Sequence, residues 1–100
     1  MSDLQLKPSA DGRLQLTGEL NFKTVPPLAV NSKNLFDNNN HLNVDLDGVS
    51  RADSAGVALL IEWQRRAKKQ NKSISFQNIP SQMLSIAKLS GVDELLSLKT

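Results

Sequence analysis

The sequence predicts a small α/β domain built on one sheet, and three observations support this. Segments in which apolar and polar residues alternate, as in half-buried strands, are interleaved with segments of helical period. The chain has 100 residues, which is the size of one domain. Strands separated by helices imply at least two crossover connections. We therefore expect residues 1–100 to form one domain, in the order strand, strand, helix, strand, helix, strand, helix.

The first elements are a strand hairpin and a helix. Leu4 and Leu6 alternate with polar residues, and residues 12–18 repeat this alternation between two glycines. A turn at 8–12, which contains Asp11-Gly12, is expected to join the two runs as antiparallel strands. Thr24 can cap a helix whose first turn tolerates the prolines at 26 and 27. The asparagine run at 38–40 is expected to end this helix.

The second half of the chain continues the alternation of strands and helices. The same patterns predict a strand at 42–46 that stops at Asp47-Gly48, a helix at 53–70, a strand at 73–76, and a helix from Pro80 to about Ser90. Gly91 is expected to terminate the last helix, since glycine readily adopts the left-handed conformation found there. The tail at 92–98 is expected to add a final turn.

Composition excludes several classes of function. The chain has no cysteine, which rules out disulfides, thiolate zinc sites and a cysteine nucleophile. A basic stretch followed by an apolar core is absent from the N-terminus, and no run approaches 18 apolar residues. We therefore expect a cytoplasmic protein without direct membrane insertion.

Catalysis is not expected either. The single histidine, His41, is predicted to lie in a loop without a partner, and Asp45, Asp47 and Asp53 fall in different elements. The sequence has no phosphate-binding loop and no second histidine for a metal pair. We expect no catalytic residue, no metal and no cofactor, so the protein is predicted to act by contact with a partner.

Basic residues concentrate near the end of the predicted helix 53–70. Twelve Lys and Arg against ten Asp and Glu give a formal net charge of +2, and five of the cations lie within 65–72. Cations at the end of a helix interact favourably with its negative terminus. The alternative is a patch for nucleic acid or lipid headgroups, but no aromatic residues are interleaved with the cations. We expect no nucleic-acid partner.

The helix predicted at 53–70 carries two apolar stripes. Asp53 or Ser54 can cap it. At about 100° per residue, one stripe is assigned to the core and comprises Gly56, Leu59, Leu60, Trp63 and Ala67. The second stripe, Val57, Ala58 and Ile61, lies between Ser54 and Arg65, where a solvated helix would carry charge. An exposed apolar strip there predicts a docking surface. The alternative is that a neighbouring helix partly covers Val57 and Ile61.

The start of this helix resembles a known family. Residues 53–57, Asp-Ser-Ala-Gly-Val, are similar to the D-S/T-x-G-L signature of STAS domains. Three further segments resemble family motifs in the same order: Thr17–Leu20, Val44–Leu46 and Asn78–Pro80. Within the family, residues 50–60, 67–70 and 86–89 resemble the MlaB-like branch. The resemblance implies a mixed sheet of four or five strands with helices packed mainly on one face.

The resemblance also implies a function. MlaB-like members are small, non-catalytic cytoplasmic partners of the MlaF-like ATPase of an ABC transporter, in a complex with permease and substrate-binding subunits. That complex moves phospholipid between the inner and outer membranes of Gram-negative cells and maintains outer-membrane lipid asymmetry. The partner-binding residues expected by this resemblance and by the helical pattern are Arg51, Asp53, Ser54, Ala55, Gly56, Val57, Ala58, Ile61 and Arg65.

A second function within the family stays open. Anti-sigma-factor antagonists share the signature, bind kinase-type anti-sigma factors and are regulated by serine phosphorylation. Their phosphoacceptor position corresponds to Ala55 here, and a methyl group cannot accept phosphate. Ser54 is then the candidate phosphorylation site, because phosphate there would place about −1.5 to −2 charges on the docking strip.

Overall fold

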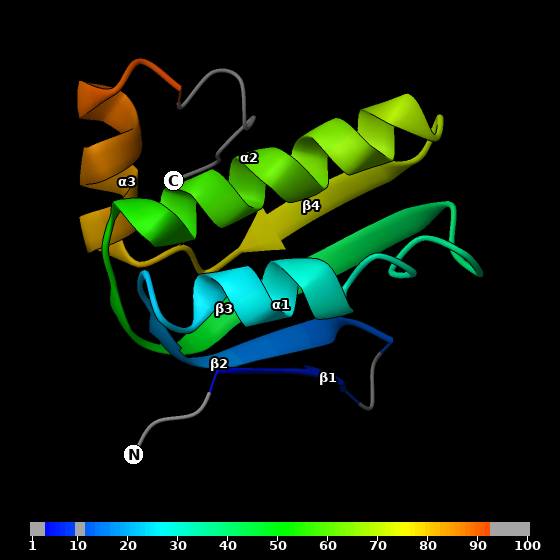
Figure 1. Cartoon of the computed structure of the whole chain (residues 1–100), viewed down its shortest axis with the longest axis horizontal. Coiled ribbons are helices and arrows are strands. Elements are labelled where there is room, and N and C mark those ends of the chain that lie inside the picture. The colour runs from blue at the N-terminus through cyan, green and yellow to red at the C-terminus, as the bar shows by residue number, and fades with distance from the viewer. Residues whose placement is uncertain (1–3, 10–11, 93–100) are drawn as a thin grey trace.

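The computed structural model describes residues 4–9 and 12–92, and within them the elements follow the predicted order (Figure 1). These elements are β1 (Gln5–Pro8), β2 (Leu14–Leu20), α1 (Val25–Asn31), β3 (His41–Ala52), α2 (Ser54–Lys69), β4 (Ser73–Gln77) and α3 (Ser81–Leu89). The predicted final turn at 92–98 lies almost entirely outside the described residues. Among the described helices, none combines the length and apolar character needed to cross a bilayer.

The strands form one mixed sheet in the order β1-β2-β3-β4. β1 pairs antiparallel with β2, as the predicted hairpin requires, and Gly12 adopts a φ of 84° in the connecting turn. β2 and β3 are parallel and are connected through α1, while β3 and β4 are parallel and are connected through α2. The prediction of a mixed sheet with two crossover connections is confirmed.

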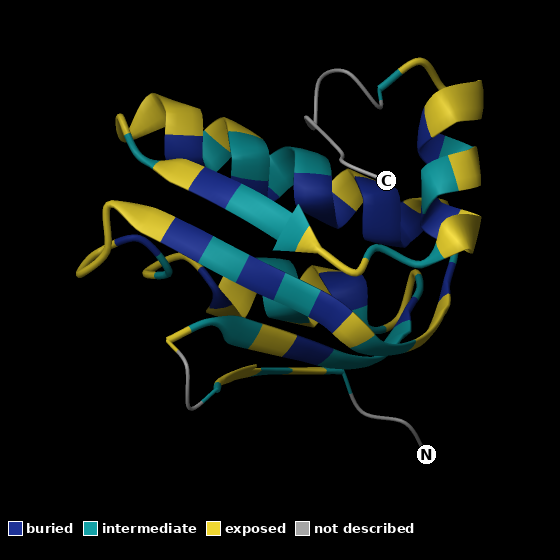
Figure 2. Ribbon diagram, turned by 180° about the vertical axis from the view of Figure 1, so that it is seen from behind, coloured by how far each residue is buried: buried dark blue, intermediate teal, exposed yellow. Residues whose placement is uncertain are grey.

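The two faces of the sheet differ in what covers them. α1 and α2 lie across one face, and the opposite face is open when the molecule is seen from behind (Figures 1 and 2). Leu42, Val44 and Leu46 on β3 are buried beneath the helices, because alternate side chains of a strand point to opposite faces.

His41, predicted in a loop, instead begins β3, and its ring contacts Ser73 and Asn43 by hydrogen bonds.

β3 is longer than predicted, because Asp47-Gly48 does not end it. The pairing with β2 shifts at two places, and at each place β3 contains one more residue than β2. A Cβ atom on Gly48 would lie 2.5 Å from Cγ2 of Thr17, so a glycine is needed where the strands approach. The strand therefore continues through an irregularity of the bulge type and ends at Ala52, beside Leu20.

The ends of the helices were predicted with mixed success. α1 ends at Asn31 rather than at the asparagine run 38–40, and Ser32 Oγ donates a hydrogen bond to the carbonyl of Ala29 at this end. α3 ends close to the prediction, and Gly91 adopts a φ of 72° after it. The amide of Gly91 donates to the carbonyl of Lys88, which satisfies one of the last carbonyl groups of the helix.

The core lies between α2 and the sheet. All five residues of the predicted core stripe of α2 are buried, and Trp63 is 0% exposed. The indole Nε1 of Trp63 donates to Oγ of the buried Ser32 at 3.0 Å. Ser32 thus satisfies the single polar atom of the largest buried side chain.

Candidate partner-binding site

The N-terminus of α2 lies where β2 and β3 end. Asp53, in extended conformation, caps the helix, since its Oδ1 accepts a hydrogen bond from the amide of Ala55 at 2.8 Å. The amide of Asp53 donates to the carbonyl of Leu20 at 3.1 Å, which attaches the cap to β2. Of the two predicted cap residues, the structure selects Asp53. Ser54 becomes the first helical residue, and its side chain is exposed.

The hydroxyl of Ser54 makes no hydrogen bond to any described residue, and it stands at the tip of the helix that Asp53 caps. The neighbouring Ala55 is 7% exposed, so the chain offers solvent a hydroxyl at residue 54 and hides the methyl group of residue 55. A partner can therefore reach Ser54 directly, whereas residue 55 contributes to packing.

A hollow of about 230 Å³ lies beside the cap, at the carboxyl ends of β2 and β3. It is lined by Glu19, Leu20, Asn21, Arg51, Ala52, Asp53 and Gln82. Arg51 and Asp53 were predicted from the sequence to belong to the site, whereas Glu19, Asn21 and Gln82 were not. The predicted crossover connections could have indicated Glu19 and Asn21. They imply parallel strands, and the carboxyl ends of adjacent parallel strands meet at one edge of a sheet. The polar side chains that line this hollow therefore border the site at Ser54.

A turn between β2 and α1 presents an exposed aromatic side chain at the same end of the sheet. Asn21 Oδ1 accepts hydrogen bonds from the amides of Lys23 and Thr24, at 2.8 and 3.0 Å. Thr24 Oγ1 donates to the carbonyl of Glu19 at 2.7 Å, which holds the turn against β2. Phe22, inside this turn, is 75% exposed. Phe22 was not among the predicted site residues, although an aromatic residue in a polar loop is a recognisable sign of a contact surface.

The predicted apolar strip of α2 is narrower than expected, and the assignment of Val57 to it is wrong. Val57 is 5% exposed, and Ile61 is half-buried and packs against the core. The cause is that α2 contacts α1, α3 and β4, so that buried residues occupy about 200° of its circumference at about 100° per residue. Ala58 remains exposed, as does Arg65 one turn beyond Ile61. The open surface of α2 therefore comprises Ser54, Ala58, part of Ile61 and Arg65.

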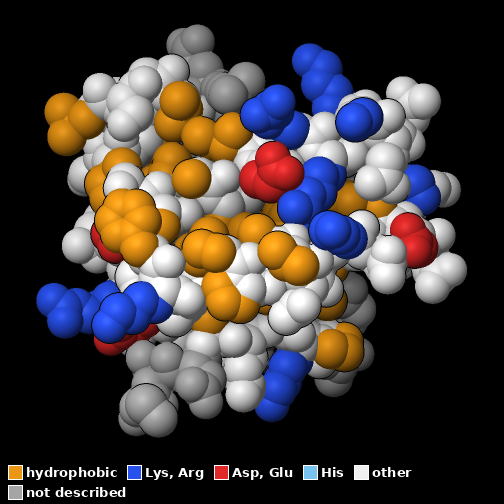
Figure 3. Space-filling model, in the orientation of Figure 1, with side chains coloured by type: hydrophobic (Ala, Val, Ile, Leu, Met, Phe, Trp, Pro, Cys, Tyr) orange, Lys and Arg blue, Asp and Glu red, His pale blue; other side chains and the backbone are white. Residues whose placement is uncertain are grey.

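The surface around this site carries exposed apolar groups. In Figure 3, apolar side chains reach the surface over α1 and over the first half of α2, beside a group of Lys and Arg side chains. Val30 on α1 is 57% exposed. We define the docking face as Ser54, Ala58 and Ile61 on α2 together with Phe22.

Gly56 determines how closely α2 approaches its neighbours. A Cβ atom there would lie 3.0 Å from Cβ of Leu20 and 3.3 Å from Cε of Met83. Gly56 thus contributes to the site by allowing close packing of the helix, and it is itself buried.

Replacing Gly56 with valine is expected to lower the free energy of unfolding by about 1–3 kcal/mol, since the added carbons overlap Leu20. Urea denaturation followed by circular dichroism measures the change. Ala58→Val also introduces a valine, at an exposed position of the same helix, and it should change stability by less than about 0.5 kcal/mol. Equal stability of the two variants would contradict the packing role of Gly56.

Comparison with known proteins identifies relatives. The chain is 39% identical over 46 residues to the intermembrane phospholipid transport system binding protein MlaB of Escherichia coli (strain K12), and equally to that of Shigella flexneri. Each alignment covers 46% of this chain, and the chain spans about half (47%) of the length of these curated relatives.

Solved structures share the fold. The anti-sigma factor antagonist SpoIIAA in its unphosphorylated form superposes with a TM-score of 0.67 at 15% identity, covering 97% of this chain and 99% of that one. A STAS domain protein from Planctomyces limnophilus gives a TM-score of 0.67 at 18% identity, covering 94% and 86%. SLC26A9 gives 0.60 at 20% identity, covering 86% of this chain and 17% of that chain. At these identities the likeness establishes the fold alone.

The sequence profile of a family agrees with both results. The profile described as "Mlab, STAS domain" matches residues 5–97, which is most of the chain. The fold class predicted from the residues and from the resemblance is confirmed by these neighbours and by the mixed sheet. Because the match extends over both the sheet and the capped helix that carries Ser54, the chain belongs to the MlaB-type STAS domain family.

Proposed function

We propose that this chain is a non-catalytic accessory subunit of an ABC-type phospholipid transporter, and that it binds the ATPase subunit through the docking face. The observation that carries the proposal is the exposed Ser54 on a capped helix tip in an MlaB-type domain. In this proposal the protein lies on the cytoplasmic side of the inner membrane, held there by the transporter complex, and supports the assembly and activity that maintain outer-membrane lipid asymmetry.

The geometry supports a contact of this kind. A stable protein interface buries about 800 Å² on each partner, with a buried apolar centre and a polar rim. Phe22 and Ala58 supply exposed apolar groups, while the hollow lined by Glu19, Arg51 and Gln82 supplies a polar rim. The site is held by the cap of Asp53 and the turn of Asn21, so that little ordering is needed on binding.

Affinity purification of the tagged chain from its native host tests the proposal. We expect the chain to retain an ABC ATPase together with a permease, and the purified ATPase to bind the purified chain directly. Mass spectrometry of the retained proteins gives the identities. Retention of a kinase-type anti-sigma factor without any ABC ATPase would overturn the proposal in favour of the second function within the family.

The second function, an anti-sigma-factor antagonist regulated by phosphorylation, predicts phosphate on the chain. Because residue 55 is a buried alanine, we expect instead that intact-mass spectra of protein from growing cells show no added phosphate. The Ser54→Ala variant is the matched control, since it removes the single exposed hydroxyl of the signature. Phosphate present on the native chain and absent from this variant would favour the antagonist.

A further inference from the structure

Two of the five basic residues in the segment 65–72 are bonded to the fold. Arg66 Nε donates to Oε2 of Glu62 at 3.1 Å, and Arg66 Nη1 lies 3.4 Å from Oγ of Ser32. Lys72 Nζ donates to the carbonyl of Phe36 at 2.8 Å. Arg66 thus connects α2 to Ser32, and Lys72, which follows α2, connects to Phe36. Both acceptors lie in the segment that follows α1. Arg66 and Lys72 therefore have a structural role.

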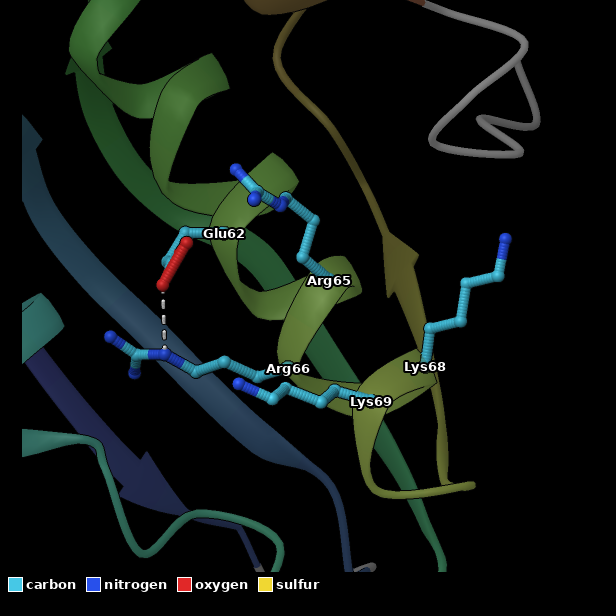
Figure 4. A pocket seen from close by; sticks show the side chains of 5 residues that line it. All are labelled: Glu62, Arg65, Arg66, Lys68 and Lys69. Atoms are coloured by element: carbon cyan, nitrogen blue, oxygen red, sulfur yellow. Dashed lines mark hydrogen bonds and ion pairs between the residues drawn. The ribbon is translucent and has the colours of Figure 1, made fainter.

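The other three cations are not used in this way. Arg65, Lys68 and Lys69 are exposed and make no hydrogen bond or ion pair to any residue that the structure describes. In Figure 4 the only dashed line joins Glu62 to Arg66; Lys69 extends beside Arg66, Arg65 extends on the side of Glu62, and Lys68 points to the opposite side of the helix. Together with Glu62 and Arg66 they line an open hollow of about 570 Å³. Arg65, Lys68 and Lys69 thus present positive charges around one concave surface, without a partner within residues 4–9 and 12–92.

Helix stability does not explain this group. Lys68 and Lys69 lie in the last turn, where the negative end of the helix favours cations, but Arg65 lies a full turn from the end of α2. Like charges three and four residues apart, as in the pairs Arg65–Lys68 and Arg65–Lys69, weaken a helix. The stability of α2 therefore does not require Arg65, Lys68 and Lys69 to lie together.

The three cations lie on the same face of α2 as the proposed docking face. At about 100° per residue, Ser54, Ala58, Ile61 and Arg65 follow one another within about 60° of the helix circumference, with Lys68 and Lys69 on either side of that line. The helix has 16 residues, which corresponds to about 24 Å. A patch of about 800 Å² is about 30 Å across, so a single partner can cover the whole face.

We propose that Arg65, Lys68 and Lys69 bind a cluster of Asp and Glu side chains on the same protein partner that covers Ser54 and Ala58. This inference rests on the proposed function. Charge complementarity supports it, since an arginine guanidinium pairs with carboxylates in two parallel hydrogen bonds and lysines add point charges. Beside these cations, residues 62–72 expose no large apolar side chain, and stable attachment to a bilayer needs such an anchor in addition to charge.

Charge reversal of the two lysines tests this inference. We expect Lys68→Glu/Lys69→Glu to lower the association rate with the purified native ATPase complex by about tenfold at about 0.05 M salt, and much less at about 0.5 M salt. Lys7→Glu/Lys88→Glu is the matched control, because it changes the net charge equally at exposed lysines away from the docking face. Surface plasmon resonance gives the rates, and circular dichroism verifies that both variants fold.

The outcomes separate this inference from the proposed function. If the native chain does not bind the ATPase complex at all, the proposed function fails and this inference fails with it. If the native chain binds but the two double variants associate at equal rates, only the cationic contact is wrong. Flotation with vesicles containing phosphatidylglycerol provides a third arm. Vesicle binding that Lys68→Glu/Lys69→Glu abolishes, with an unchanged ATPase association rate, would overturn the inference in favour of a lipid surface.

Discussion

Replacing Trp63 with alanine is expected to lower the free energy of unfolding by about 3–5 kcal/mol. Trp63 is 0% exposed and lies among the buried residues of the core, so the change leaves a cavity that rigid neighbours cannot fill. Small domains unfold with about 5–15 kcal/mol, and the variant is therefore expected to be close to unfolded at physiological temperature. Guanidinium denaturation followed by far-ultraviolet circular dichroism measures the change.

Two milder variants separate packing from hydrogen bonding at this position. Trp63→Phe retains an aromatic ring and loses the Nε1 donor. Ser32→Ala retains the indole ring of Trp63 but leaves its Nε1 donor buried without an acceptor. We expect Ser32→Ala to cost about 1–3 kcal/mol, because an unsatisfied buried donor loses its hydration without compensation. A Trp63→Ala variant as stable as the native chain would show that this side chain is not central to the core.

Replacing Ser54 with arginine is expected to weaken binding of the ABC ATPase by at least about 30-fold, which corresponds to the 2 kcal/mol typical of a residue at the centre of an interface. The arginine side chain would place bulk and charge where the proposed partner contacts an exposed small hydroxyl. Stability should stay within about 0.5 kcal/mol, because Ser54 is exposed and the cap is formed by Asp53. Isothermal titration with the purified ATPase measures the affinity.

The control for this variant lies on the opposite face of the sheet. Gln15→Arg introduces the same side chain at an exposed position of β2 that points away from the helices, and its affinity should equal that of the native chain. Ala58→Glu should reproduce the loss on the docking face. Ile61→Asp is unsuitable as a binding test, since Ile61 packs against the core and its replacement also lowers stability. Unchanged affinity of Ser54→Arg would remove Ser54 from the interface.

The success of the sequence predictions differs from element to element for physical reasons. The strands β2 and β4 and the helix α2 were found because a period of two or of 3.6 residues is written directly in the order of apolar residues. β3 was cut short because Asp47-Gly48 is a turn signal by local chemistry. In the structure β3 continues through Asp47-Gly48, because it stays paired with β2 through a shift in register that places Gly48 beside Thr17.

The candidate site divides in the same way. The sequence predicted a helix cap at Asp53 or Ser54, since capping depends on hydrogen bonds between residues two or three apart, and the structure selected Asp53. The signature at 53–57 also placed the chain in its family, as the profile match confirms. By contrast, Glu19, Asn21 and Gln82 come from three different segments, and only the folded sheet brings them together beside Arg51.

The sequence by itself determined the order of the elements, the core stripe around Trp63 and the capped start of α2, because each depends on periodicity or on contacts between near neighbours in the chain. The tertiary structure alone decided that Val57 is buried, that Phe22 is exposed and that Arg65, Lys68 and Lys69 have no hydrogen-bond or ion-pair partner among the described residues. Burial of a helix flank depends on which other elements pack beside it. A helical wheel contains no information about α1, α3 and β4, the elements that contact α2 in the folded protein.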